Sequence, residues 1–242
     1  MTHIAVMQPY LFPYLGYYQL VHHVSEFVFF DDVNFIKRGY VVRNHILCDG
    51  ASCRFTLPVH RASQNRLIKD HIFLDDASTV TNRIEHAYRR APHFSAVYPL
   101  ISSVLTDPNR SVANITACSI RCVFTYLGLE KRFSFSSDIS KSRLEKGEQK
   151  IIEICVAKRA RQYTNAIGGK ELYHSDTFAS RGIALQFIRM NDINYSQLSP
   201  CFVPNLSIID ILMNCPKEQV RSLLDDYSIE MAPNSLLTIR GA

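Results

Sequence analysis

A proline-broken aromatic loop near the amino terminus constrains the fold more than any other part of the chain. An apolar strand at 4–7 runs into Pro9 and Pro13, and proline fixes φ and lacks a backbone N–H, so strand and helix both stop there. The apolar spacing is helical at 15–24, and a compact apolar run follows at 27–31. The pattern predicts strand, loop, helix, strand.

The carboxyl-terminal half of the chain repeats this alternation. Strand patterns at 132–135, 163–167 and 183–188 are separated by helical patterns. Such alternation specifies parallel strands joined by right-handed crossovers. We therefore predict an α/β, Rossmann-like fold with a mostly parallel sheet of about five strands.

Two segments interrupt the alternation. Residues 45–48 and 53–59 flank Asp49 and Gly50, a turn pair typical of a β-hairpin. Residues 78–128 are helical and form either a layer over the sheet or a helical subdomain beside it. The length fits one domain, 1–242, that contains this helical segment.

The tail of the chain is predicted to be helical. An apolar helix follows Asn205, and Pro216 opens another helix that ends near Tyr227.

Composition narrows the classes of ligand. The net charge is +5, and the 27 Lys and Arg residues are spread along the chain, which favours a local anionic ligand and disfavours a nucleic-acid track. The seven cysteines have no disulfide-like spacing, which indicates a reducing cytoplasm. We expect no membrane span, since no apolar run is long enough. The scattered histidines predict no metal site, and the sequence does not indicate the oligomeric state.

The first loop supplies the candidate ligand-binding residues Gln8, Tyr10, Tyr14 and Tyr17. Its strand, loop, helix layout resembles that of nucleotidyltransferases, where His-x-Gly-His binds nucleotide phosphates. Tyrosines stand in place of both histidines, and neutral tyrosine does not stabilise phosphate charge as imidazolium does. A structural alternative is that these aromatic rings plug the core.

The second loop combines carboxylates with cations. Asp31 and Asp32 end the predicted second strand, and Lys37, Arg38 and Arg43 follow closely. One carboxylate can serve as a general base while the cations hold a diphosphate, or the charges simply pair and fix the loop. We expect Asp32 to pair with Lys37 or Arg38, which leaves Asp31 as the preferred base.

A third loop follows the strand at 163–167. Asn165 and Lys170 flank Gly168 and Gly169, which serve either a backbone approach to a ligand or a plain turn. Loops that leave neighbouring parallel strands meet at the ligand crevice of an open α/β sheet. We expect the three loops to form one site.

These motifs resemble those of the WbqC-like family of bacterial proteins. The resemblance covers nearly the whole chain, and it rests on these segments: Gln8 to Tyr17, Phe29 to Val33, Lys37 to Tyr40, Arg43-Asn44, Leu57 to Val59, Tyr163 to Tyr173, Gly182-Ile183 and Pro204 to Asp210. It implies a setting in surface-polysaccharide biosynthesis, such as O-antigen assembly, where nucleotide-linked amino sugars are modified.

Our first functional hypothesis is an enzyme that transfers an acyl or aminoacyl group to the amine of a nucleotide-linked amino sugar. The donor would be a coenzyme A or phosphopantetheine thioester, the latter on an acyl carrier protein, with no permanently bound cofactor. Asp31, Asp32 or His23 would be the base and the cations would hold the diphosphate. The remaining predicted substrate-binding residues are Asn44, Asn165, Gly168, Gly169, Tyr173 and Asn205.

Two further hypotheses stay open. The chain is either a nucleotide-sugar or carrier-protein binding module without chemistry of its own, or a divergent nucleotidyltransferase-like enzyme.

Overall fold

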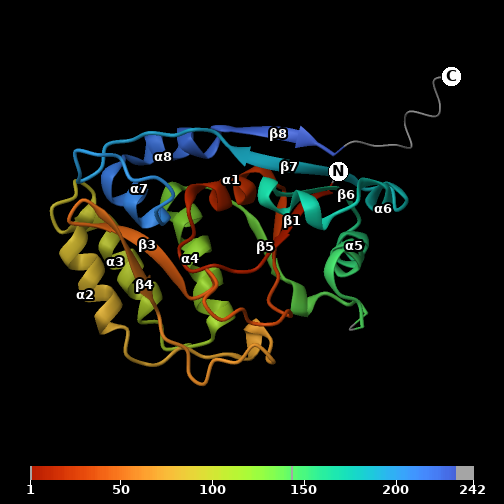
Figure 1. Ribbon diagram of the computed structural model, residues 1–242, viewed down its shortest axis with the longest axis horizontal. Helices are drawn as coiled ribbons and strands as arrows, with labels where there is room; N and C mark the ends of the chain where they lie inside the picture. The colour runs from red at the N-terminus through yellow and green to blue at the C-terminus, as the bar shows by residue number, and fades with distance from the viewer. Residues whose placement is uncertain (1, 143, 233–242) are drawn as a thin grey trace.

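A mostly parallel sheet forms the centre of the protein (Figure 1). The computed structural model describes residues 2–142 and 144–232. The sheet is six-stranded, in the order β5-β2-β1-β6-β7-β8, and only β8 runs antiparallel to its neighbour. The strands are β1 (Thr2–Met7), β2 (Glu26–Phe29), β5 (Arg132–Phe135), β6 (Ala160–Ala166), β7 (Ala184–Met190) and β8 (Tyr227–Met231). The predicted Rossmann-like α/β fold is confirmed.

The sequence did not reveal β8. Only two residues separate it from the preceding helix, and a run of five residues is too short to distinguish an edge strand from a helix end. The second strand is also shorter than predicted, since β2 ends at Phe29, before Asp31 and Asp32.

The strand order reverses direction at β1. The chain passes from β1 outward to β2 and β5, then returns to the other side of β1 as β6 and β7. The carboxyl ends of β1 and β6 therefore flank a topological switch point, where open α/β sheets bind their ligands.

Helices cover both faces of the sheet. Side chains alternate between the faces along each strand, so neighbouring residues of β1 pack against different helices. On one face, Ala5 packs with α1 (Leu15–His23) and α4 (Val112–Leu127), and α8 (Lys217–Leu224) lies against both helices. On the other face, Ile4 and Val6 pack with α5 (Gly147–Ala157) and α6 (Ser175–Ala179). No helix in the described ranges is long and apolar enough to cross a membrane.

The predicted hairpin is present beside this layered core. It consists of β3 (Arg43–Cys48) and β4 (Ala51–Thr56), and both turn residues, Asp49 and Gly50, have positive φ. The hairpin contacts α2 (Ser78–Tyr88) and α7 (Ile208–Asn214), and α3 (Phe94–Leu105) packs against these two helices; Figure 1 shows all of them on the same side of the sheet.

The predicted helical segment 78–128 thus has two roles. Its last helix, α4, belongs to the layer over the sheet, whereas α2 and α3 lie beside the sheet with the hairpin. Three short 3-10 helices complete the described elements: η1 (Ile68–Asp70), η2 (Ser136–Asp138) and η3 (Ile167–Leu172).

Candidate functional site

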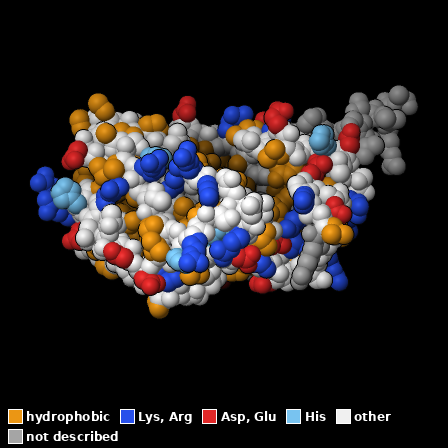
Figure 2. Space-filling view, turned by 60° about the horizontal axis from the view of Figure 1, so that its bottom comes forward, with side chains coloured by type: hydrophobic (Ala, Val, Ile, Leu, Met, Phe, Trp, Pro, Cys, Tyr) orange, Lys and Arg blue, Asp and Glu red, His pale blue; other side chains and the backbone are white. Residues whose placement is uncertain are grey.

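A cleft opens at the switch point between β1 and β6. Its volume is about 600 Å³. Figure 2 views the carboxyl side of the sheet and shows hydrophobic side chains in a hollow near the middle of that face, with Lys and Arg side chains beside it. Of the predicted residues, those that line the cleft are Gln8, Tyr10, Tyr14, Tyr17, Asn165, Gly168, Gly169 and Tyr173. The structure thus brings the first and third loops together.

The first loop forms an aromatic wall. The Tyr17 hydroxyl donates to the Gln8 carbonyl at 2.8 Å, which fixes the turn after β1. The Tyr10 ring lies 5.5 Å from that of Tyr17 and 6.0 Å from that of Tyr40. Tyr40 lines the cleft as well; it was not among the predicted binding residues, although it ends the motif Lys37 to Tyr40.

Gly16 allows Tyr14 to join this wall. A Cβ at position 16 would lie 2.6 Å from Cε2 of the Tyr14 ring, closer than atoms can pack. Glycine in the first turn of α1 therefore makes room for the ring.

The opposite wall comes from β6 and the segment after it. Asn165 Oδ1 accepts a hydrogen bond from the Ala166 N–H at 2.7 Å, and its Nδ2 donates to the Tyr163 hydroxyl at 3.1 Å. Gly168 and Gly169 do not form the left-handed turn that glycine permits; they lie in η3 with negative φ. Gly169 instead packs on Asn165, where a Cβ would lie 3.3 Å from the amide carbon.

A second chamber of about 380 Å³ adjoins the cleft and shares Tyr10, Tyr14 and Tyr40 with it. Asn44 and Asn205, both predicted as ligand residues, line this chamber. The buried Asn44 amide donates to the Phe12 carbonyl at 2.7 Å, so it also fixes the first loop.

The segment before α7 holds the first loop from outside. The Ser207 hydroxyl donates to the Phe12 carbonyl at 2.6 Å and accepts from the Ile209 N–H at 3.3 Å, so it caps α7 and binds the loop at once. The Ile208 N–H donates to the Pro13 carbonyl at 2.8 Å. Residues nearly 200 positions apart in sequence thus shape one site.

Sequence reasoning missed Glu148, in the first turn of α5. Among the described residues that line the cleft, it carries the only carboxylate. Its oxygens contact the backbone N–H and Nδ1 of His174. A signal was available: a helix that follows a parallel strand begins at the strand's carboxyl edge, so the start of α5 had to lie near the crevice.

The cleft is otherwise uncharged. Burial raises the pKa of Tyr10, Tyr14, Tyr17 and Tyr173, so these hydroxyls are neutral donors at physiological pH. No Lys or Arg lines the cleft among the residues that the structure describes.

The model of the WbqC-like protein family matches residues 8–222, a range that begins with the first loop and includes both walls of the cleft. The chain belongs to the WbqC-like protein family. It is 24% identical over 227 residues to the uncharacterized protein Rv1507c of Mycobacterium tuberculosis, an alignment that covers 90% of this chain and 96% of that protein. No solved structure matches the chain.

In this WbqC-like protein, Asp31 lies outside the cleft and has structural partners. It is 3% exposed. Its carboxylate accepts from the Ser137 N–H at 3.0 Å, the Ser137 hydroxyl at 2.7 Å and the Ser136 hydroxyl at 3.1 Å. These bonds hold the start of η2 and occupy the Asp31 carboxylate, which was the predicted base.

Asp32 pairs with different cations from those predicted. Lys141 and Lys150 lie 2.9 and 3.2 Å from its carboxylate, in place of Lys37 or Arg38. Burial acts to raise the pKa of Asp32, but hydrogen bonds from Ser136 and Lys141 and the nearby lysine charges outweigh it and lower that pKa. The prediction failed because these partners are more than 100 residues away in sequence.

The predicted cations do not line the cleft either. Lys37 and Arg38 are exposed on the turn that precedes Tyr40. They are near the rim of the cleft only because Tyr40, which lines it, follows closely in the chain. Arg43 lies on β3, where it alternates with Asn44 and so faces the other side of the hairpin. Its Nε is buried and has no hydrogen-bond partner among the described residues.

His23 lies at the opposite edge of the sheet. α1 starts at the cleft and runs back along the sheet, so its last residue reaches the amino edge. There His23 contacts the Tyr227 hydroxyl at 2.9 Å and the Gln186 amide at 2.7 Å. The described residues contain no group of three or more His, Cys, Asp or Glu side chains that could hold a metal ion.

Proposed function

We propose that this WbqC-like protein transfers an acyl or aminoacyl group to the amine of a nucleotide-linked amino sugar, in the biosynthesis of a surface polysaccharide such as O-antigen. The observation that carries the proposal is an aromatic, amide-bearing cleft at the switch point with one carboxylate, Glu148, in its wall. Tyrosine rings offer apolar faces and polar tips, which suit a sugar or nucleobase. Asn165 adds an amide to orient it.

The second chamber suits the donor. A phosphopantetheine arm, on coenzyme A or an acyl carrier protein, is neutral along most of its length and carries amide groups. Pro13, Tyr40 and Asn205 offer apolar surface and an amide to such an arm. The shared tyrosines would then line the boundary where the thioester meets the amine, while Lys37 and Arg38 on the neighbouring turn reach for the phosphates.

The chemistry is aminolysis of a thioester. Glu148 takes a proton from the sugar ammonium, and the freed amine attacks the thioester carbonyl carbon. The C–N bond forms, the C–S bond breaks, and the leaving thiolate takes up the second proton, which the nitrogen loses as it becomes an amide. Backbone N–H groups at Gly168 and Gly169 would stabilise the oxyanion. In this proposal Glu148 replaces Asp31, Asp32 and His23 as the base.

The cellular setting follows from the thiols. The cysteines of the described chain are free, which supports a reducing cytoplasm, where nucleotide sugars and thioester donors are made.

The test is transfer of labelled acyl groups from coenzyme A and carrier-protein thioesters to a panel of nucleotide-linked amino sugars. We expect Glu148→Gln to lower kcat by about 100-fold or more, the usual scale for a lost general base, and to change KM little. Glu218→Gln is the matched control, since Glu218 also lies in the first turn of a helix, away from the cleft.

Two outcomes would refute the proposal. Binding of the sugars without turnover would favour a binding module, and release of pyrophosphate from ATP or CTP would favour a nucleotidyltransferase. Equal kcat for the Glu148 and Glu218 variants would remove Glu148 as the base.

A further inference from the structure

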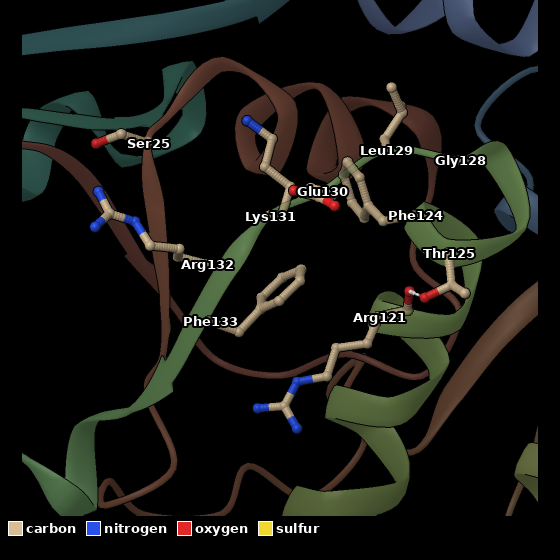
Figure 3. A pocket seen from close by; sticks show the side chains of 10 residues that line it. All are labelled: Ser25, Arg121, Phe124, Thr125, Gly128, Leu129, Glu130, Lys131, Arg132 and Phe133. Atoms are coloured by element: carbon tan, nitrogen blue, oxygen red, sulfur yellow. Dashed lines mark hydrogen bonds between the residues drawn. The ribbon is translucent and has the colours of Figure 1, made fainter.

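A groove separate from the cleft and the second chamber lies at the amino edge of the sheet, between α4 and the edge strand β5. Its volume is about 920 Å³. In Figure 3 the side chains of Arg121, from α4, and Phe133, from β5, extend into the space between these two elements. Ser25, just before β2, also lines the groove, so it opens away from the cleft, which lies at the carboxyl edge.

Arg121 is a partly buried cation without a counter-ion. Its guanidinium carbon lies 5.3 Å from the Phe29 ring centroid, 5.6 Å from that of Phe133 and 5.3 Å from that of Phe135. Burial lowers its pKa, and no carboxylate of the described chain pairs with it. The rings compensate part of the desolvation, and an incoming anion would compensate more.

The edge of β5 is open. Its strand neighbour is β2 on one side, and residues 132–135 make no backbone hydrogen bond to other described segments. An open edge beside a helix can accept an extended peptide as an added strand, with backbone hydrogen bonds for affinity and side-chain pockets for specificity.

The charges of the groove select the occupant. Arg121, Lys131 and Arg132 line it with one acid, Glu130. Lys131 donates to the carbonyls of His22 and Val24, so the two arginines are the cations left for a ligand. A second copy of this chain would bring two basic edges together, which disfavours a dimer through β5.

We propose that the groove binds an extended acidic segment of a partner protein, which adds a strand to β5. A carboxylate of the segment pairs with Arg121, and an apolar side chain packs on Phe124 and Phe133. This inference does not depend on the proposed enzymatic function.

The test uses fluorescein-labelled hexapeptides that alternate Asp or Glu with Val, Leu or Phe, and a matched pool with Lys or Arg in place of the acids. We expect the acidic pool to bind at least about tenfold more tightly, and Arg121→Gln to weaken the best acidic peptide at least about tenfold. Arg90→Gln, which alters an exposed arginine in the turn after α2, should change nothing.

Amide chemical shifts of the wild-type protein locate the peptide even where the variant fails to fold. We expect the largest changes at 129–135, and loss of binding when peptide nitrogens are methylated. Equal binding of the basic pool, equal affinity of the two arginine variants, shift changes elsewhere, or full displacement by inorganic phosphate would each overturn the proposal.

Discussion

At the scale of single residues, the shape of the cleft depends most directly on Gly16. The Tyr14 ring occupies the space that a Cβ at position 16 would need. Tyr14 lines both the cleft and the second chamber, so a displaced ring would obstruct both. Because Gly16 lies in α1, replacement by alanine should not weaken the helix itself, where alanine is favoured over glycine by about 0.5–1 kcal/mol.

We therefore predict that Gly16→Ala separates binding from stability. The affinity for a nucleotide-linked amino sugar should fall by about tenfold or more, a change of about 1.4 kcal/mol, while the melting temperature stays unchanged or rises. Titration calorimetry and thermal denaturation measure the two quantities. An unchanged affinity would mean that the Tyr14 ring does not contact the ligand.

The partners of Asp31 and Asp32 could not be predicted from the sequence. We predicted different roles for Asp31 and Asp32; both bond to Ser136, but Ser137 contacts Asp31 alone and Lys141 pairs with Asp32. The partners themselves, Ser137 and Lys141, come from the distant η2 region, and nothing in the spacing of the sequence links them to the aspartates. The positions of the tyrosines could be predicted because prolines and a helix start fix that loop locally.

At the scale of elements, α7 and the first loop act as one unit through Ser207. Its hydroxyl caps α7 and binds the Phe12 carbonyl, and the side chain is fully buried. Loss of the hydroxyl leaves the Ile209 N–H without its partner and leaves the Phe12 carbonyl with one donor, the Asn44 amide, in place of two.

We predict that Ser207→Ala lowers the free energy of unfolding by about 1–2 kcal/mol, the range for a lost helix cap. Ser222→Ala, in the exposed part of α8, is the control and should change it by less than about 0.5 kcal/mol. Urea denaturation gives both values. Equal effects of the two variants would show that Ser207 does not couple the loop to α7.

The order of elements was predictable wherever local patterns are strong. Prolines, apolar periodicity and the Asp-Gly turn indicated the βαβ alternation and the hairpin, and the structure has both. The antiparallel strand β8 and the 3-10 helix η3 were missed, because their backbone conformation is set by neighbours in the fold and not by their own residues. Glu148 could have been predicted from the sequence, because the helix that contains it was predicted and a helix after a parallel strand begins near the crevice.

At the scale of the whole molecule, a histidine cluster links the sheet to α1 at the amino edge. The His3 and His23 rings lie 4.8 Å apart, and His3 contacts the Thr164 hydroxyl on β6. Burial, followed by the charges of His23 and Lys131, lowers the pKa of His3 from 6.5 to about 4. Burial also lowers the pKa of His22 and His23.

These lowered pKa values predict acid sensitivity. Between pH 6.5 and about 4 the unfolded chain binds a proton at His3 that the folded chain does not. The free energy of unfolding is therefore highest above pH 6.5 and decreases as the pH falls through that window. Because His3 is partly exposed, we expect its protonation to lower the free energy of unfolding by about 1 kcal/mol.

The variant His3→Gln should lose less stability than wild type across this window, and thermal denaturation against pH measures the difference. His86→Gln, which alters an exposed histidine on α2, should follow the wild-type curve. A His3→Gln curve parallel to wild type would assign the acid sensitivity to other groups.

A crystal structure of the WbqC-like protein with a nucleotide-linked amino sugar tests most directly whether the cleft is the substrate site. We predict that the sugar lies between the carboxyl ends of β1 and β6, against Tyr10 and Tyr14, with its amine within about 3.5 Å of the Glu148 carboxylate. A ligand bound instead in the lysine-lined pocket beside Asp32, or in the groove beside β5, with the cleft empty, would contradict it.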